Sequence, residues 1–259
     1  MSRQPKSKQS RNQSTSNDEM NRELNRELQE YQNRERPNKK KLTKEEFQNY
    51  NIQLTPKQTE LYKGIRNNTL TICHGPSGTS KTYTACYTAL SLLADGKIDK
   101  IILTKPLQTS WEDVGYLKGS LEEKVSPFMK SYFTTFEKIM GKVNFEWFMT
   151  IGAIQVETLA FMRGASYDRS LLLIDEVQNC NMSQIMLWVT RLGEGSKAMM
   201  MGDVSQYDVK AKDSNFLDFI RLMEGVDNVY NFRFGIEDIV RNKFLIDVVE
   251  RYEKWKYKN

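Results

Sequence analysis

The sequence predicts an α/β domain of three layers, in which helices cover both faces of a mostly parallel sheet. Short apolar runs recur through residues 42–259, and most are separated by stretches with helical spacing of apolar residues. Such alternation is typical of parallel strands joined by crossover helices. A glycine-bearing loop follows the first run and an acidic pair follows the fourth. Both features predict a binding site at the carboxyl ends of the strands.

Six apolar runs have the length and composition of buried strands. They are Leu70–Cys73, Lys100–Leu103, Ile154–Val156, Leu171–Ile174, Ala198–Met201 and Val229–Phe232. Residues Tyr83–Leu93 have a helical pattern, and Leu121–Met140 predicts a longer helix with an aromatic-rich face. We expect that face to pack against the domain, and a surface that stacks nucleic-acid bases is the alternative.

Residues 1–41 differ in composition from the rest of the chain. The first 17 residues contain almost nothing to bury, which predicts disorder, and a repeated Asn-Arg-Glu-Leu sequence then predicts a short helix. Lys39–Lys41 is either part of a solvated linker or a contact with nucleic acid or another anionic surface. We therefore expect a basic tail at 1–41, disordered or partly helical, and one folded domain at 42–259.

Charge is distributed unevenly along the chain. Residues 1–41 hold 11 of the 38 Lys and Arg residues and 6 of the 33 Asp and Glu residues, which leaves 27 of each sign for the remainder. The whole formal excess of +5 therefore lies in the tail. A nucleic-acid site on the folded domain would have to be a local basic patch.

Cysteine use and hydropathy indicate a cytoplasmic protein without a membrane partner. Cys73, Cys86 and Cys180 have no paired spacing, and no secretory signal is recognisable, which fits a reducing compartment. No apolar run approaches the length of a membrane span. His74, the single histidine, closes the first strand and is expected to serve packing or backbone bonding.

The loop between the first strand and the first long helix predicts a phosphate-binding site. It reads Gly75, Pro76, Ser77, Gly78, Thr79, Ser80, Lys81 and Thr82. Backbone N–H groups in such a loop can cradle phosphate oxygens, with the helix start and Lys81 adding positive charge. The hydroxyl of Thr82 can hold Mg²⁺. Together with the acidic pair Asp175 and Glu176, this loop specifies a nucleoside triphosphate and its metal.

One residue departs from the usual pattern of such loops. Ser80 stands where a glycine is usual, and that glycine often has a positive φ. A left-handed conformation costs a residue with a Cβ roughly 1–2 kcal/mol. Serine is small, so we expect phosphate binding to survive.

Several linked motifs resemble those of known ATPases. The segments Asp175–Asn179 and Gly202–Gln206 resemble the metal-binding and coupling motifs of superfamily-one helicases. More specific similarity is to the PhoH family of ATPases, and it extends from about Leu54 to Tyr252. The segments that carry it are Phe161–Gly164, Thr190–Lys197, Gly115–Leu117 and Glu123–Val125. The resemblance implies a RecA-like P-loop ATPase domain that binds ATP.

The resemblance also implies residue roles. Lys81 would reach the β and γ phosphates, and Thr82 and Asp175 would hold Mg²⁺ directly or through water. Glu176 would orient and polarise the attacking water as a general base. Each role is implied only because the residue at that position matches the family's motif.

Further roles concern the base and the γ-phosphate. Gln206 resembles the helicase glutamine that senses the γ-phosphate, and Gln58 the upstream glutamine that reads the adenine edge. Arg233 resembles the arginine that stabilises charge developing on the γ-phosphate. Weaker candidates are Arg241, Arg163 and Arg191. An ion pair with a surface carboxylate is the alternative for each arginine.

Two hypotheses on function remain open. The first is an ATPase coupled to binding or remodelling RNA or single-stranded DNA, with Thr104–Pro106 and Thr109–Trp111 as strand-contacting candidates. The second is a nucleotide-gated assembly or binding protein in which hydrolysis is slow, as Ser80 suggests. A small-molecule kinase is a minor third option, disfavoured by Gly202–Gln206.

The expected partner for the ATP site is a second copy of the chain. Helicases of this superfamily close ATP between two RecA-like domains, yet only seven residues follow Tyr252 here. We therefore expect a homo-oligomer, such as a hexameric ring, in which a neighbouring subunit completes the site.

Overall fold

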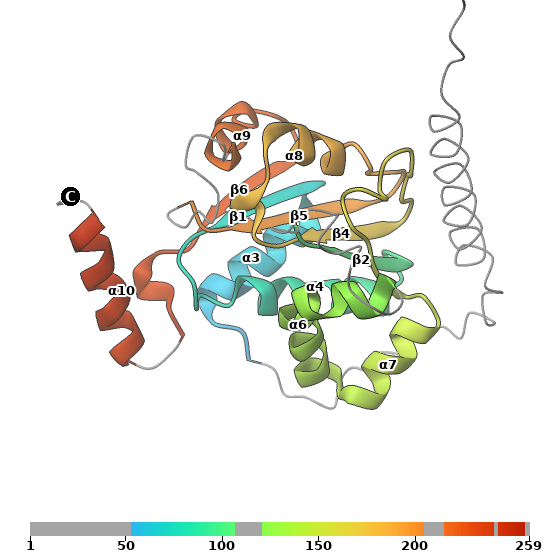
Figure 1. Ribbon diagram of the computed structural model, residues 1–259, viewed down its shortest axis with the longest axis horizontal. Coiled ribbons are helices and arrows are strands. Elements are labelled where there is room, and N and C mark those ends of the chain that lie inside the picture. Colours follow the sequence, from blue (N-terminus) through green and yellow to red (C-terminus); the bar gives the residue numbers. More distant parts are fainter. Residues whose placement is uncertain (1–52, 107–120, 205–214, 241–242, 257–259) are drawn as a thin grey trace, which may run out of the picture. The chain divides into compact units, whose positions relative to one another are not determined.

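The computed structural model describes residues 53–106, 121–204, 215–240 and 243–256 (Figure 1). The predicted tail at 1–41 lies outside the described residues, and so do the candidates Trp111, Gln206 and Arg241. Within the described residues, six strands form one sheet in the order β3-β2-β4-β5-β1-β6.

All six predicted strands are confirmed, and each end lies within one residue of its prediction. The strands are β1 Leu70–His74, β2 Lys100–Thr104, β3 Ile154–Val156, β4 Ser170–Ile174, β5 Lys197–Gly202 and β6 Val229–Arg233. Every neighbouring pair runs parallel, so the sheet is wholly rather than mostly parallel. Their carboxyl ends therefore meet at a single edge.

The helices form a layer on each face of the sheet, as Figure 1 shows. One layer contains α3 Pro56–Asn67, α4 Lys81–Ala94, α6 Leu121–Met140 and α7 Lys142–Thr150, and the other contains α8 Met182–Val189 and α9 Phe216–Leu222. A further helix, α10, spans Lys243–Lys256. The predicted three-layer architecture is confirmed.

Alternating strand side chains build the two cores. In β4, Leu171 and Leu173 join the cluster beneath α4 and α6, whereas Leu172 and Ile174 join the cluster beneath α8 and α9. All four are fully buried. Successive side chains of a strand point to opposite faces, so a strand covered on both sides has a continuous apolar sequence.

The aromatic face of α6 is a packing surface. Tyr132 and Phe136 are completely buried, and Phe136 stacks on Phe145 of α7 with ring centroids 5.9 Å apart. Phe133 also packs against this core. The rings of Tyr132 and Phe136 are unavailable for stacking on nucleic-acid bases, so the packing interpretation is correct for these two.

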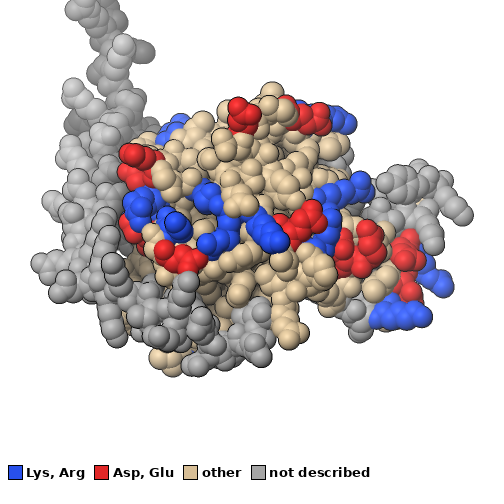
Figure 2. Space-filling model, turned by 180° about the vertical axis from the view of Figure 1, so that it is seen from behind, with Lys and Arg blue, Asp and Glu red and all other residues tan. Residues whose placement is uncertain are grey.

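Charge of both signs covers the described surface. Figure 2 shows Lys and Arg side chains gathered across one face, with Asp and Glu beside them. Arg66 pairs with Asp95 at 2.8 Å, and Arg169 pairs with Asp99 at 3.1 Å. Among the described helices, none combines the length and apolar character that crossing a bilayer requires.

Candidate functional site

The glycine-bearing loop and the acidic pair meet at the carboxyl edge of the sheet. Strand β5 lies between β1 and β4, and the loop begins with a hydrogen bond from Gly75 N–H to the Gly202 carbonyl at 3.2 Å. Helix α4 then carries Thr82 to the end of β4. The Thr82 hydroxyl donates to Asp175 Oδ2 at 3.1 Å. The two predicted halves of the site are therefore in direct contact.

The loop holds the lysine against its own backbone. Lys81 Nζ donates to the carbonyl oxygens of Gly75 at 2.6 Å and Pro76 at 2.9 Å, and the Thr79 hydroxyl donates to the same Pro76 oxygen at 3.0 Å. Gly75 has a φ of 143°, and a Cβ there would lie 2.5 Å from the Phe234 carbonyl oxygen. Position 75 therefore requires glycine. The two hydrogen bonds of Lys81 keep its ammonium charge at the loop.

Ser80 adopts the left-handed conformation predicted for its position. Its φ is 66° and its ψ is 28°, and it stands immediately before the first residue of α4. The Ser80 side chain makes no capping hydrogen bond, whereas its carbonyl accepts from Thr84 N–H at 2.9 Å. The loop therefore carries backbone strain of roughly 1–2 kcal/mol that glycine would not have.

Substitution of this residue is expected to relieve that strain. Ser80→Gly should raise the free energy of unfolding by about 0.5–1 kcal/mol, because relief of the left-handed conformation exceeds the added flexibility of glycine in the unfolded chain. Chemical denaturation measures the difference. Ser80→Ala is the matched control, since it keeps a Cβ and should show no gain. Equal stability of the two variants would contradict the strain.

The acidic pair has one buried and one half-exposed member. Asp175 follows β4 with only 8% of its side chain exposed, whereas Glu176 is 46% exposed. Burial raises the pKa of Asp175, the Lys105 ammonium opposes that rise, and the Glu176 charge adds to it. Asp175 Oδ1 accepts the Glu176 N–H at 3.0 Å, so Oδ2 is the oxygen that faces Thr82.

Glu176 has an unusual backbone conformation that the sequence did not indicate. Its φ is 60° and its ψ is 35°, at the start of the short 3₁₀ helix η1, Val177–Asn179. Left-handed residues with a Cβ are strained, and such strain concentrates at functional sites. Here the left-handed residue leads the chain from β4 into η1.

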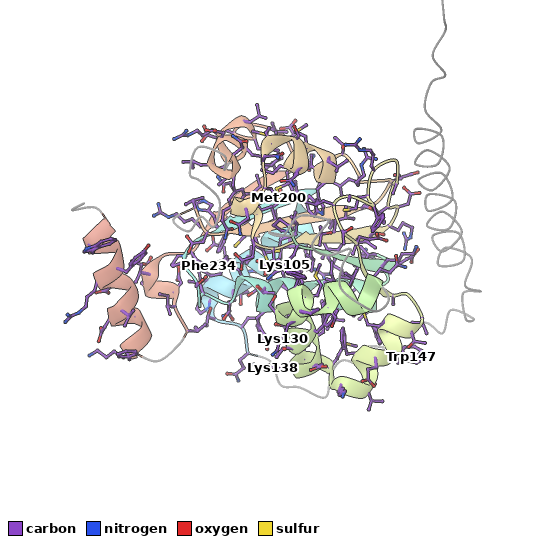
Figure 3. The ribbon with its side chains drawn as sticks, in the orientation of Figure 1. Lys105, Lys130, Lys138, Trp147, Met200 and Phe234 are labelled. Carbon is purple, nitrogen blue, oxygen red and sulfur yellow. The ribbon has the colours of Figure 1, made fainter. Side chains whose placement is uncertain are left out.

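Lys105, which is labelled in Figure 3, lies beside the acidic pair, and its contact with a nucleic-acid strand stays a prediction. Its Nζ is 3.9 Å from Asp175 Oδ2 and 3.9 Å from Glu176 Oε1, and its side chain is 14% exposed. The physical reason is strand order, because β2 pairs with β4 and the residues that follow both strands become neighbours. Lys105 is therefore a counter-ion of the acidic pair.

Gln178 connects the acidic pair to the next strand, a role that sequence reasoning missed. Its Nε2 donates to Glu176 Oε2 at 2.7 Å, and its Oε1 accepts the Asp203 N–H at 3.1 Å. The side chain is buried. The sequence shows a glutamine two positions after a carboxylate, which is a weak signal for such a role. Its partner Asp203, which follows β5, can be recognised only in the fold.

Gln58 lies at the start of α3 and completes a capping box there. Its Oε1 accepts the Thr55 N–H at 3.0 Å, and the Thr55 hydroxyl accepts the Gln58 N–H at 3.2 Å. These bonds fix the orientation of the buried amide. The neighbouring Lys57 ammonium lies 4.8 Å from the ring centre of Phe232 in β6, which places this helix start beside the end of that strand.

Arg233 ends β6 on the other side of the loop strand. It is exposed and lies in register with His74 of β1. Burial lowers the pKa of His74, and the charges of Arg233 and Lys81 lower it further. Strand order puts β5 and β1 between Arg233 and Asp175. The arginine and the acidic pair therefore flank the loop on opposite sides.

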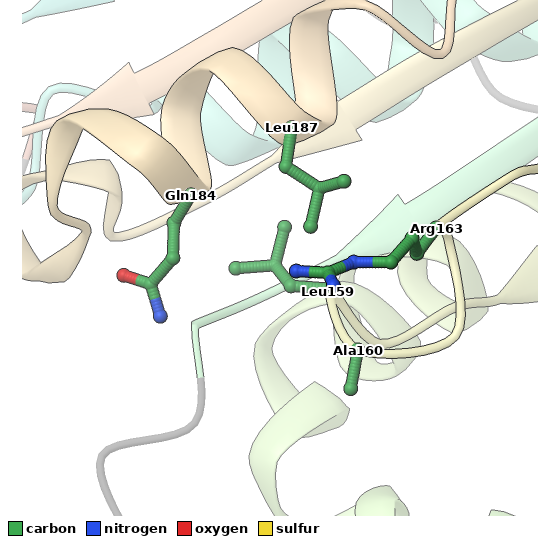
Figure 4. Close-up of a pocket in the computed structure, with 5 residues that line it drawn as sticks. All are labelled: Leu159, Ala160, Arg163, Gln184 and Leu187. Atoms are coloured by element: carbon green, nitrogen blue, oxygen red, sulfur yellow. The ribbon is translucent and has the colours of Figure 1, made fainter.

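The two remaining candidate arginines within the described residues, Arg163 and Arg191, lie near α8. Arg191 donates to the carbonyl oxygens of Leu187 and Ala165, each at 3.1 Å, so carbonyls rather than carboxylates hold it. Arg163 is exposed and borders a surface pocket of about 370 Å³ (Figure 4). The other residues lining that pocket are Leu159, Ala160, Gln184 and Leu187. The described hydrogen bonds and ion pairs of the loop and the acidic pair include neither arginine.

The parallel sheet, the lysine-bearing loop and the acidic strand end define a RecA-like P-loop nucleoside-triphosphatase fold. The family model described as PhoH-like protein matches residues 52–253. The chain belongs to the PhoH family.

Proteins of similar sequence support this membership. The chain is 35% identical over 198 residues to a PhoH-like protein of Bacillus subtilis (strain 168), a match covering 76% of this chain and 62% of that protein. It is 29% identical over 188 residues to Protein PhoH of Escherichia coli (strain K12), covering 71% and 53%. The chain thus spans between half and two thirds of the length of these relatives.

Solved structures share the fold at low sequence identity. The large terminase from a thermophilic bacteriophage has a TM-score of 0.52 and 11% identity, covering 78% of this chain and 50% of that chain. A second crystal form of that terminase, in complex with ADP, has a TM-score of 0.50 and 12% identity, with the same coverage of both chains. These similarities concern the fold alone.

Proposed function

We propose that this protein binds ATP with Mg²⁺ at the loop and acidic pair and hydrolyses it. The observation that carries the proposal is the 3.1 Å hydrogen bond from Thr82 to Asp175, which joins the phosphate-type loop to a buried carboxylate. Membership of the PhoH family supports it. The ADP held by the bacteriophage terminase supports nucleotide binding on this fold.

The residues present fit a magnesium ion. Thr82 offers a hydroxyl oxygen and Asp175 a carboxylate oxygen, and these are the hard ligands that Mg²⁺ prefers. The two oxygens already face each other. The ion would supply charge neutralisation for the triphosphate when bound, with the phosphates and water completing its ligands.

The chain's own residues then have distinct tasks. Lys81 exchanges its bonds to the loop carbonyls for bonds to the β and γ phosphates. Glu176 accepts a proton from the water whose oxygen attacks the γ-phosphorus, while the bond to the ADP oxygen breaks. Gln178 holds Glu176 in orientation through its 2.7 Å hydrogen bond. Arg233 stabilises charge that develops on the transferring phosphoryl group.

Three candidates complete this proposal. Gln58 reads the adenine edge with the amide that α3 holds in place. Gln206 senses the γ-phosphate and Arg241 contacts the nucleotide, although both lie outside the described residues.

Coupling to RNA or single-stranded DNA is the finer part of the proposal. The segment Gly202–Gln206 resembles the helicase coupling motif, and Gln178 connects its Asp203 to Glu176 by two hydrogen bonds. A change at this segment therefore reaches the proposed general base through direct contacts.

Turnover measurements test the coupling. ATP hydrolysis is measured at low salt with and without a panel of single-stranded RNA and DNA, and stimulation by at least one strand is expected, because such binding is electrostatic and salt-sensitive. A protein that hydrolyses ATP equally under all these conditions is an ATPase without the proposed coupling.

Assembly into a homo-oligomer is supported by α10. Phe244, Val248, Tyr252 and Trp255 follow one face of this helix and are 74%, 43%, 52% and 61% exposed. Exposed apolar surface of this kind is typical of interaction sites. Light scattering with nucleotide present should show a particle larger than one chain. A strictly monomeric particle with full ATPase activity would rule out completion of the site by a neighbour.

The alternative function is nucleotide-gated assembly or binding with slow hydrolysis. The strained Ser80 favours it, because a loop held in a costly conformation can reduce the rate of chemistry. Single-turnover rates of the wild type and Ser80→Gly separate the two functions. A large gain in rate supports a weakened motor, and an unchanged rate supports an ATPase in which Ser80 is merely tolerated.

A further inference from the structure

Lys105 is a buried charge at the candidate site to which the proposed hydrolysis assigns no task. It follows β2, whose last residue Thr104 is in register with Ile174 at the end of β4. Its ammonium is equally distant, 3.9 Å, from Asp175 Oδ2 and Glu176 Oε1. With 14% of its side chain exposed, Lys105 is poorly screened by solvent.

The ammonium and a metal ion would need the same oxygen. Asp175 Oδ1 accepts the Glu176 N–H, and Oδ2 faces both the Thr82 hydroxyl and Lys105. A magnesium ion between Thr82 and Asp175 would therefore bind the oxygen beside which Lys105 lies. Two cations this close repel each other strongly where solvent is largely excluded.

We infer that Lys105 is a built-in counter-ion that competes with the metal for Asp175. It offsets part of the negative charge of the acidic pair in the metal-free protein, and it separates from Asp175 Oδ2 when the metal–nucleotide complex binds. A buried carboxylate without a cation is unfavourable, which explains why a resident ammonium is useful in the empty site. This inference rests on the proposed function of the site.

The competition determines the order in which ligands bind. Metal alone must displace Lys105 and gains only two protein ligands, the oxygens of Thr82 and Asp175, so it binds weakly. Metal accompanied by a nucleotide gains phosphate ligands, and the phosphates supply new negative charge for the displaced ammonium. Metal and nucleotide therefore enter together.

The direct test measures Mn²⁺ binding to the nucleotide-free, full-length protein at one fixed pH. Free Mn²⁺ is quantified by electron paramagnetic resonance. Lys105→Met keeps an unbranched side chain that is one atom shorter and removes its charge, and its Kd for Mn²⁺ should be about tenfold lower than that of the wild type, or lower still. A Kd within about twofold of the wild type would overturn the inference.

Two controls isolate the role of this particular charge. Lys142→Met removes a lysine that is 73% exposed and paired with Glu146 on α7, and it should leave the Mn²⁺ affinity unchanged. Lys105→Arg keeps the positive charge and should keep the weak binding of the wild type. If Lys105→Arg tightened Mn²⁺ binding as much as Lys105→Met, competition by charge would be rejected.

Thermal unfolding covers the case in which Lys105→Met folds poorly. Loss of the ammonium leaves two carboxylates adjacent, so the variant should unfold at a lower temperature without metal and recover when Mn²⁺ is added. The wild type should gain much less from the same addition. An equal gain in the two proteins would contradict the inference.

Nucleotide binding by the wild type separates this inference from the proposed function. A fluorescent ADP analogue with Mg²⁺ reports that function directly. If the wild type binds the analogue but Lys105→Met does not tighten Mn²⁺ binding, only the counter-ion role fails. If the variant tightens Mn²⁺ binding and no nucleotide binds, only the ATP site fails.

Discussion

Glu176→Gln should lower ATP turnover by about 10²-fold or more while nucleotide binding is retained. The amide has nearly the shape of the carboxylate and keeps an oxygen that can accept the Gln178 hydrogen bond, but it cannot accept the proton of the attacking water. Steady-state hydrolysis and the Kd of a fluorescent ATP analogue measure the two effects separately.

The matched control for this variant is Glu146→Gln. Glu146 lies on α7 with 61% of its side chain exposed, so the same chemical change there should leave turnover unaffected. Two results would contradict the assignment of Glu176 as the general base. One is turnover within about threefold of the wild type, and the other is a loss of binding as large as the loss of rate.

Lys81→Ala should abolish measurable ATP binding. The Lys81 ammonium is held at the loop by the carbonyls of Gly75 and Pro76, and the proposed function has it bind the β and γ phosphates from there. Without it, the phosphates lose a charge-assisted hydrogen bond at the point of greatest negative charge. Isothermal titration calorimetry with Mg²⁺ present measures the loss.

The control for Lys81→Ala is Lys97→Ala, which removes an exposed lysine after α4 and should bind ATP normally. Circular dichroism establishes that both variants are folded. An unchanged ATP affinity in folded Lys81→Ala would remove the loop from the proposed site.

Most of the fold could be predicted because its signals are local. The four inner strands are short apolar runs buried on both faces, and the helix Leu121–Met140 has the same bounds in the structure as in the sequence pattern. Strand order could not be predicted in the same way. Which strands become neighbours depends on contacts between segments far apart in the chain, and periodicity carries no information about them.

The site also has features that local sequence signals predict and features that depend on strand order. The contact between the loop and the acidic pair followed from two motifs at strand ends, and the left-handed Ser80 followed from the position of the usual glycine. The ion pairs of Lys105 could not be predicted because its neighbours are defined by the pairing of β2 with β4. The bridging role of Gln178 could not be predicted, because its hydrogen bond to Asp203 links the end of β4 to the end of β5.

The position of β1 in the sheet has a consequence for how the chain folds during synthesis. Its neighbours are β5 and β6, and Leu70 is in register with Ala198 and Val229. Strand β1 therefore has no backbone partner in the sheet until β5 or β6, more than a hundred residues downstream, has been synthesised. Long-range pairing of this kind is slow, and the apolar strand stays exposed to chaperones and to aggregation until β5 has been made.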